Sequence, residues 1–136
     1  MKKLSILVIE NDPDEQIFIK EAFEETPYFN LLGLLHSGQE LLSYLQTREG
    51  RLPDLILSEL LMPVVDGFDV ISLVKSDQQF VNIPVYIMST TALEAIIEKC
   101  LDLGAAAYIE KPNLLLGYSG FLERLSVMAE DNANKQ

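Results

Sequence analysis

The sequence predicts a single α/β domain, a doubly wound parallel sheet of five strands that alternate with five helices. Short apolar runs of strand length alternate along the chain with longer stretches of helical spacing, and the connections between them are short. The apolar run that begins after Pro53 is unbroken, which is typical of a strand buried on both faces of a parallel sheet. Such alternation requires right-handed crossovers, which place helices on both faces of the sheet.

The composition limits the number of domains and the classes of partner. A chain of 136 residues forms one domain, and 49% hydrophobic residues suffice for a core. Ten basic and 21 acidic residues give a net charge of −11, which repels phosphate backbones and anionic lipids. Nucleic acid and membrane surfaces are therefore excluded as direct partners. No apolar run reaches transmembrane length and the N-terminal one is too short for a secretory signal, so we expect a cytoplasmic protein.

The first strand is expected at Leu4–Ile9, a short run rich in β-branched residues. A helix follows at once, because Asp12 can cap it and Pro13 suits its first position. Glu15 stands where a capping box places its acidic partner. Pro27 ends this helix, since the residue before a proline avoids helical angles.

The second strand is expected at Phe29–Leu35, and a capping box of Ser37 with Glu40 opens the second helix, which Gly50 stops. The third and central strand ends at Glu59. A helix then opens at Asp66-Gly67 and runs out before a fourth strand over residues 84–88.

A further capping box, Thr91 with Glu94, opens the fourth helix, and Gly104 is placed to end it. The fifth strand is expected at residues 105–109. The last helix lies between Asn113 and Met128 with a late or frayed start, because glycines 117 and 120 each cost about 1 kcal/mol relative to alanine. We therefore expect one domain over residues 1–128 and a polar tail without a fold over residues 129–136.

Polar residues follow four of the five predicted strands. The commonest order of such a sheet, 2-1-3-4-5, places strands one and three side by side, and ligands bind at the carboxyl ends of the strands. Each side chain has an ordinary explanation of its own: Asp12 as a helix cap, for example, or Lys111 as a surface charge. Their occurrence at one edge of the sheet is unlikely by chance. That edge would bring together Glu10, Asn11, Asp12, Glu59, Ser89 and Lys111.

From residue 3 to residue 128 the chain resembles the receiver domains of bacterial two-component response regulators. The resemblance rests on four ordered motifs with family-like spacing: residues 6–14, residues 53–57 with 62–67, residues 83–89 and residues 104–112. It implies a flavodoxin-like (βα)5 fold with strand order 2-1-3-4-5.

The resemblance also implies roles for individual residues. In the family an acidic pair after strand one and an aspartate after strand three bind Mg²⁺, and the aspartate takes a phosphoryl group from a histidine kinase. By position Ser89 matches the hydroxyl that contacts the phosphoryl oxygens, Lys111 the lysine that stands before a proline, and Tyr108 the aromatic that reports the change to the last helices. The resemblance further implies a cis bond at Lys111-Pro112.

Two positions depart from the family pattern. Glu59 stands where the phosphoacceptor aspartate is expected, and Asn11 is neutral where the usual direct metal ligand is acidic. Mg²⁺ demands near-ideal octahedral oxygen geometry, so we expect weak or absent Mg²⁺ binding at the candidates Glu10, Asn11 and Glu59, and no other cofactor. An attacking oxygen moved by about 1 Å costs on the order of 10²-fold in rate, so Glu59 is a poor acceptor. Its longer side chain could act as a permanent, partial stand-in for a phosphorylated aspartate, mimicking either the active or the inactive state.

Because of these two departures, with Ser89, Tyr108 and Lys111 kept, the leading hypothesis is a stand-alone pseudo-receiver, a signalling module without enzymatic activity. We expect no output domain after Met128, so the module would act by binding a histidine kinase or another signalling protein. The expected contact is the face of the fourth helix, fifth strand and last helix, which could also hold a homodimer patch. Core packing is the simpler explanation for the apolar residues there: Tyr108, Leu114, Leu115, Leu116, Tyr118 and Phe121.

Two alternatives stay open. One is a working phosphoacceptor that uses Glu59, Asp66 or Asp12. The other is a flavin-binding flavodoxin relative, although the acidic segment of residues 12–15 would repel phosphate.

Overall fold

The computed structural model describes residues 2–47, 50–113 and 117–134. It contains a five-stranded sheet of order β2-β1-β3-β4-β5 in which every neighbouring pair is parallel. The predicted fold class and strand order are therefore confirmed. The strands are β1 (Leu4–Ile9), β2 (Phe29–Leu35), β3 (Leu55–Glu59), β4 (Val85–Ser89) and β5 (Ala107–Glu110). The helices are α1 (Pro13–Glu25), α2 (Gln39–Thr47), α3 (Gly67–Lys75), α4 (Glu94–Asp102) and α5 (Ser119–Asn134).

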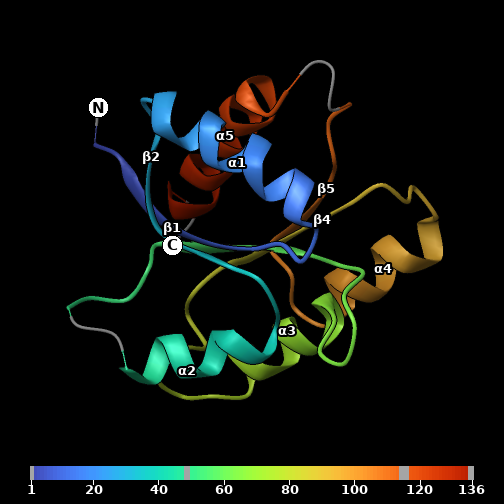
Figure 1. The fold of residues 1–136 in the computed structure, drawn as a ribbon. Coiled ribbons are helices and arrows are strands. Elements are labelled where there is room, and N and C mark those ends of the chain that lie inside the picture. Colours follow the sequence, from blue (N-terminus) through green and yellow to red (C-terminus); the bar gives the residue numbers. More distant parts are fainter. Residues whose placement is uncertain (1, 48–49, 114–116, 135–136) are drawn as a thin grey trace.

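Helices cover both faces of the sheet. Figure 1 shows α1 and α5 on one face and α2, α3 and α4 on the other. Alternate residues of β1 enter different cores: Ile6 and Val8 pack with α1 and α5, whereas Leu7 and Ile9 pack with the other three helices. This double burial explains why the inner strands are mainly apolar in the sequence and do not alternate with polar residues.

Two of the predicted helix starts are wrong in detail. The fourth helix begins at Glu94 with Leu93 as its N-cap, and the Thr91 hydroxyl accepts a hydrogen bond from the Leu93 N–H, so Thr91 forms a local turn and no capping box. The second helix begins at Gln39, and the Glu40 carboxylate accepts from the N–H of His36. Short polar side chains can satisfy several nearby N–H groups, so the motif alone does not fix the cap.

The last helix starts late, as expected, but it continues past Met128 to Asn134. The prediction that an unfolded tail begins at Ala129 is wrong for the described residues. Ala129 is buried in the core between α5 and the sheet, and this packing stabilises a final stretch whose polar composition predicts no fold.

Two further observations concern the whole described chain. The Lys111-Pro112 bond is trans, because no peptide bond among the described residues is cis; the trans form is the more stable one even before proline. None of the helices in the described part is long and apolar enough to cross a membrane.

Candidate functional site

The carboxyl ends of the strands meet at one edge of the sheet. Glu59 ends β3 between β1 and β4, Glu10 follows β1, and Lys111 follows β5. The structure brings these three side chains into direct contact, although the sequence separates Glu10 from Lys111 by most of the chain. Parallel pairing in the order given above produces this convergence.

Lys111 is the centre of the contacts. Its side chain is only 5% exposed, and its Nζ lies 2.7 Å from Oε1 of Glu10. The same ammonium contacts Oε2 of Glu59 and Oε2 of Glu15. One buried cation therefore bridges three carboxylates that come from β3, α1 and the segment after β1.

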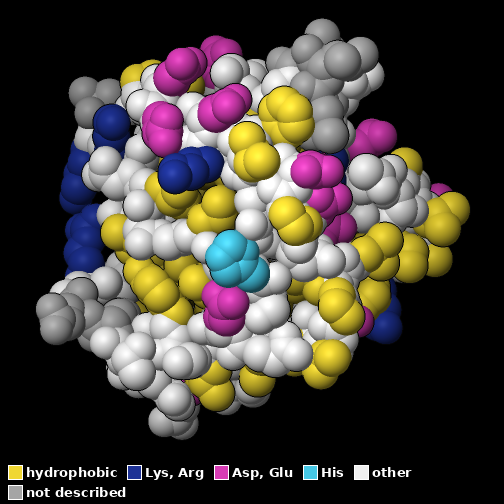
Figure 2. Space-filling view, in the orientation of Figure 1, with side chains coloured by type: hydrophobic (Ala, Val, Ile, Leu, Met, Phe, Trp, Pro, Cys, Tyr) yellow, Lys and Arg dark blue, Asp and Glu magenta, His cyan; other side chains and the backbone are white. Residues whose placement is uncertain are grey.

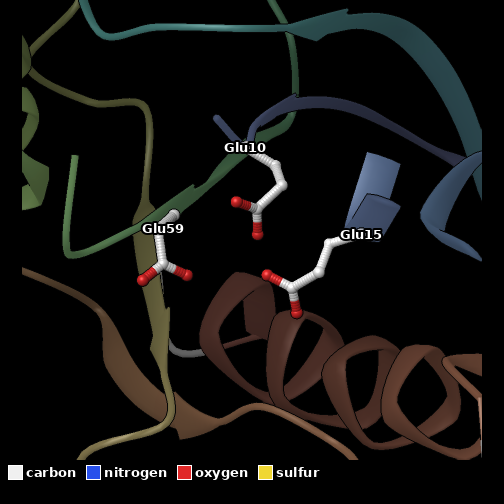
Figure 3. Close-up of side chains that lie close together, drawn as sticks. All are labelled: Glu10, Glu15 and Glu59. Carbon is white, nitrogen blue, oxygen red and sulfur yellow. The ribbon is translucent and has the colours of Figure 1, made fainter. Parts of the chain in front are cut away.

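The three carboxylates point toward a common space (Figure 3). One oxygen atom from each of Glu10, Glu15 and Glu59 lies within 4.8 Å of the others. We call these three residues the glutamate cluster. Glu10 is fully buried and Glu59 is 5% exposed, so two of the three negative charges lie out of contact with solvent.

Glu15 is the pocket residue that the sequence did not identify. A capping box would direct its carboxylate to the N–H of Asp12, but Oε2 of Glu10 accepts that hydrogen bond at 3.1 Å. Glu15 is therefore free to turn into the pocket, where its Oε1 also accepts a hydrogen bond from the Tyr118 hydroxyl at 3.2 Å. The available signal was its place in the first turn of the helix after β1, at the edge where the strands end.

Asp12 does not belong to the pocket, contrary to the sequence prediction. Its side chain caps α1, accepting hydrogen bonds from the N–H groups of Asp14 at 2.8 Å and Glu15 at 3.3 Å. Its carboxylate is exposed. The helix start needs an acceptor at this position, and that local requirement holds the side chain outside. Asn11 lies between Glu10 and Asp12, is partly buried, and brings no charge.

Both oxygens of the Glu59 carboxylate are occupied. Oε1 accepts a hydrogen bond from the N–H of Leu61 at 3.1 Å, and Oε2 contacts Lys111. Burial raises the pKa of Glu59, and the hydrogen bond from Lys111 offsets only part of that rise. The residue in the phosphoacceptor position is thus held in place by two donors.

Burial dominates the electrostatics of Glu10 as well, and raises its pKa to about 7 despite its contacts with Lys111 and the Asp12 N–H. Burial alone would lower the pKa of Lys111, but its hydrogen bonds to Glu10, Glu15 and Glu59 outweigh burial and raise it. Lys111 therefore carries a positive charge, which the three carboxylates of the glutamate cluster stabilise.

Ser89 and Tyr108 lie beside the pocket and contact the loop between β4 and α4. Ser89 is fully buried, and its hydroxyl accepts a hydrogen bond from the N–H of Thr91 at 3.4 Å. The Tyr108 hydroxyl donates to the carbonyl oxygen of Thr91. Burial raises the pKa of Tyr108, and a hydrogen bond with Ser89 works against that rise. The Tyr108 ring is therefore fixed against this loop.

Two residues expected on a partner-binding face are core residues. Tyr118 is 2% exposed and Phe121 is 1% exposed, and their rings pack edge to face with centroids 5.4 Å apart. Leu114, Leu115 and Leu116 lie outside the described residues. Core packing is thus the correct explanation for Tyr118 and Phe121, and neither can touch a partner.

The space between the three carboxylates, where a divalent metal ion would bind, is taken by the Lys111 ammonium. Carboxylate oxygens are suitable ligands for Mg²⁺, which prefers oxygen donors in near-octahedral geometry. However, the Lys111 ammonium already contacts all three carboxylates of the glutamate cluster. A further acidic ligand is missing, because the side chain at position 11 is the neutral amide of Asn11.

The sequence matches the family model described as the response regulator receiver domain over residues 6–115. A curated relative, the probable methanogenesis regulatory protein FilR2 of Methanothrix harundinacea, is 29% identical over 110 residues, which cover 79% of this chain and 71% of that protein. Other curated relatives are much longer: the chain spans 39% of one and 6% of another.

Solved structures share the fold over nearly the whole chain. The signal receiver domain of a histidine kinase from Syntrophus aciditrophicus is 25% identical, with a TM-score of 0.75 over 98% of this chain and 94% of that one. The phosphorylated cyanobacterial phytochrome response regulator RcpA is 27% identical, with a TM-score of 0.72 over 96% of this chain and 91% of that one.

Proposed function

The chain belongs to the response regulator receiver domain family, and we propose that it serves two-component signalling through protein contact, with a pocket that phosphorylation does not switch. We assign it no catalytic activity of its own. Glu59 then acts as a fixed acidic group in place of a phosphoacceptor aspartate.

The observation that carries this proposal is the bridging of Glu59 by Lys111, within a cluster that also contains Glu10 and Glu15. Phosphoryl transfer depends on positioning and on neutralising charge on the transferred group. Lys111, the cation that would meet the phosphoryl oxygens, is already paired with three carboxylates. An incoming phosphoryl donor would meet excess negative charge and an acceptor whose oxygens are both engaged. The extra methylene of Glu59 also displaces the attacking oxygen, which costs on the order of 10²-fold for about 1 Å.

We propose that the partner is a histidine kinase or another signalling protein, and that it binds the face of α4, β5 and α5. With Tyr118 and Phe121 in the core, the apolar contact would come from α4. Figure 2 shows apolar side chains gathered over the α4 side of the molecule. Leu93 and Leu101 are both exposed there. A second copy of the chain could use the same face.

Incubation with acetyl phosphate and Mg²⁺, followed by intact mass spectrometry, tests the proposal. We expect no covalent phosphoryl adduct on the wild type. The Glu59→Asp variant is the comparison, since it restores the acceptor expected for the family while leaving Glu10, Glu15 and Lys111 unchanged. Stoichiometric labelling of the wild type that disappears in Glu59→Gln would overturn the proposal.

The second candidate is a working phosphoacceptor, favoured by the 27% identity to a relative solved in phosphorylated form. Three carboxylates were candidates from the sequence. Asp12 caps α1 and Asp66 caps α3 in a capping box with Asp69, so both are engaged outside the pocket. This candidate therefore rests on Glu59 alone, and labelling by a cognate histidine kinase would distinguish it from the contact module.

A further inference from the structure

We propose that the Lys111 ammonium is the resident cation of the glutamate cluster, and that it excludes divalent metal ions which Glu10, Glu15 and Glu59 bind once the lysine is removed. The inference deepens the proposed function and rests on it, because a module that is not switched by phosphate needs no metal ion. It adds a role for Glu15 as the third oxygen donor of the pocket.

The cluster has the arrangement of a cation site. Two of its carboxylates come from the segment after β1 and the first turn of α1, the third comes from the end of β3, and an oxygen atom of each lies within 4.8 Å of the others (Figure 3). Oxygens at these separations can surround one cation at ordinary coordination distances. Like charges buried this closely repel one another, and a cation between them stabilises their charged forms.

The position of Lys111 is a second, independent observation that the space between the three carboxylates accommodates a cation. Its side chain is nine-tenths buried, and its ammonium reaches all three carboxylates, with Nζ 2.7 Å from Oε1 of Glu10. A metal ion bound to the same oxygens would lie next to Nζ and would be repelled by its charge. Lysine and metal are therefore mutually exclusive occupants.

The Lys111 ammonium competes for the glutamate cluster more effectively than a metal ion from solution does. It belongs to the chain and is positioned by β5 immediately before it, so its binding is an intramolecular event with a high effective concentration. One ammonium nevertheless leaves the cluster with more negative than positive charges. Removing it leaves three oxygen donors with a strong requirement for a cation.

Glu15 is held toward the cluster by a partner of its own. The Tyr118 hydroxyl, buried just before α5, donates to Oε1 of Glu15 at 3.2 Å, while the other oxygen of Glu15 faces Lys111. A hydrogen bond of this kind orients a ligating carboxylate. The Tyr118→Phe change removes the hydroxyl and keeps the ring, so it isolates this orienting contact.

Mn²⁺ is the probe, and its binding to the full chain is measured by electron paramagnetic resonance of the free ion and by calorimetry. Wild type should not bind Mn²⁺ in the millimolar range, whereas Lys111→Met should bind it at least about tenfold more tightly. Adding Glu15→Gln to Lys111→Met should reverse most of this gain. Adding Tyr118→Phe should reverse part of it. Lys20→Met, at an exposed position of α1, is the matched control and should behave as the wild type.

Three results would overturn the inference. The wild type could bind Mn²⁺ as tightly as Lys111→Met, the folded Lys111→Met could fail to bind it, or Glu15→Gln could leave binding in Lys111→Met unchanged. If Lys111→Met is unfolded alone, circular dichroism with added Mn²⁺ decides, since recovery of the fold supports the inference and its absence contradicts it. Phosphorylation of the wild type would overturn the proposed function and leave these Mn²⁺ comparisons intact, so the two failures are distinguishable.

Discussion

Glu10 links the burial of the pocket to the stability of the fold. Its carboxyl group has its pKa raised from 4.5 to about 7, and burial is the main cause. Between these two values the folded chain binds more protons than the unfolded chain. The free energy of unfolding therefore falls as the pH rises through this window. The pKa of Glu59 is raised as well, so this residue acts in the same direction.

We expect the wild type to lose on the order of 3 kcal/mol of stability between pH 4.5 and about 7, because a tenfold change in proton affinity corresponds to about 1.4 kcal/mol. The raised pKa of Lys111 contributes stability that persists throughout this window, since its ordinary value is 10.5. Urea unfolding at a series of pH values measures the slope. Glu10→Gln should flatten it, whereas Glu98→Gln, at an exposed position of α4, should leave it unchanged. A stability that rises with pH in the wild type would contradict this expectation.

Part of the site could be predicted from the sequence, since any parallel sheet of this order brings together the residues directly after its strands. Glu10, Glu59 and Lys111 converge for that reason. Glu15 could not be placed, because its position suits a capping box as well as a pocket. The choice depends on whether Oε2 of Glu10 reaches the N–H of Asp12, which is a matter of side-chain geometry. The same geometry leaves Asp12 as a cap.

At the scale of elements, the start of α3 approaches the end of β3 closely, and Gly67 permits this. A Cβ atom at Gly67 would lie 2.7 Å from the Cα of Leu60 and 2.9 Å from the carbonyl oxygen of Glu59. The Gly67 N–H also donates to the carbonyl oxygen of Leu60 at 2.8 Å. Backbone atoms cannot yield as a side chain can, so a methyl group here must push the helix away from the strand that carries Glu59.

Gly67→Ala should therefore destabilise the fold by about 1–3 kcal/mol, the usual cost of overpacking. Gly120 in α5 is the matched control, because a Cβ there would meet only the tip of Arg124 at 3.8 Å. Gly120→Ala should stabilise the fold by about 0.5–1 kcal/mol, since alanine has the higher helix propensity. Thermal unfolding of both variants measures the difference. Equal effects of the two substitutions would show that the close approach at Gly67 does not matter.

The elements themselves were predictable to different degrees. The first two strands have the expected bounds: β1 is almost fully buried and rich in β-branched residues, and β2 is a mainly apolar run although it lies at the edge of the sheet and is partly exposed. Helix ends were less predictable, because several polar side chains compete for the same N–H groups, as Thr91 shows at α4. The end of α5 depends on the packing of Ala129 against the sheet, and such tertiary contacts leave no local pattern.

At the scale of the whole molecule, the excess of acidic residues opposes the compact state. The net charge is −11, and folding brings these charges closer together than they are in the unfolded chain. The end of α1 adds to this repulsion, because Glu24 and Glu25 lie at the negative end of the helix dipole and no basic residue occupies the last turn. Exposed charges of this kind are screened by salt, whereas the buried glutamate cluster is screened much less.

Raising the NaCl concentration from low to near-molar should therefore stabilise the wild type, by on the order of 1 kcal/mol, as the Debye length shrinks from about 30 Å at 0.01 M to about 3 Å at 1 M. The double variant Glu24→Gln with Glu25→Gln should be more stable at low salt and should gain less from added salt. Glu15→Gln removes a charge that Lys111 and Tyr118 hold in the pocket, so its response to salt should match that of the wild type. Urea unfolding at several NaCl concentrations measures all three. If salt destabilised the wild type, attractive surface ion pairs would outweigh the repulsion, and the excess of acidic residues would not be what limits its stability.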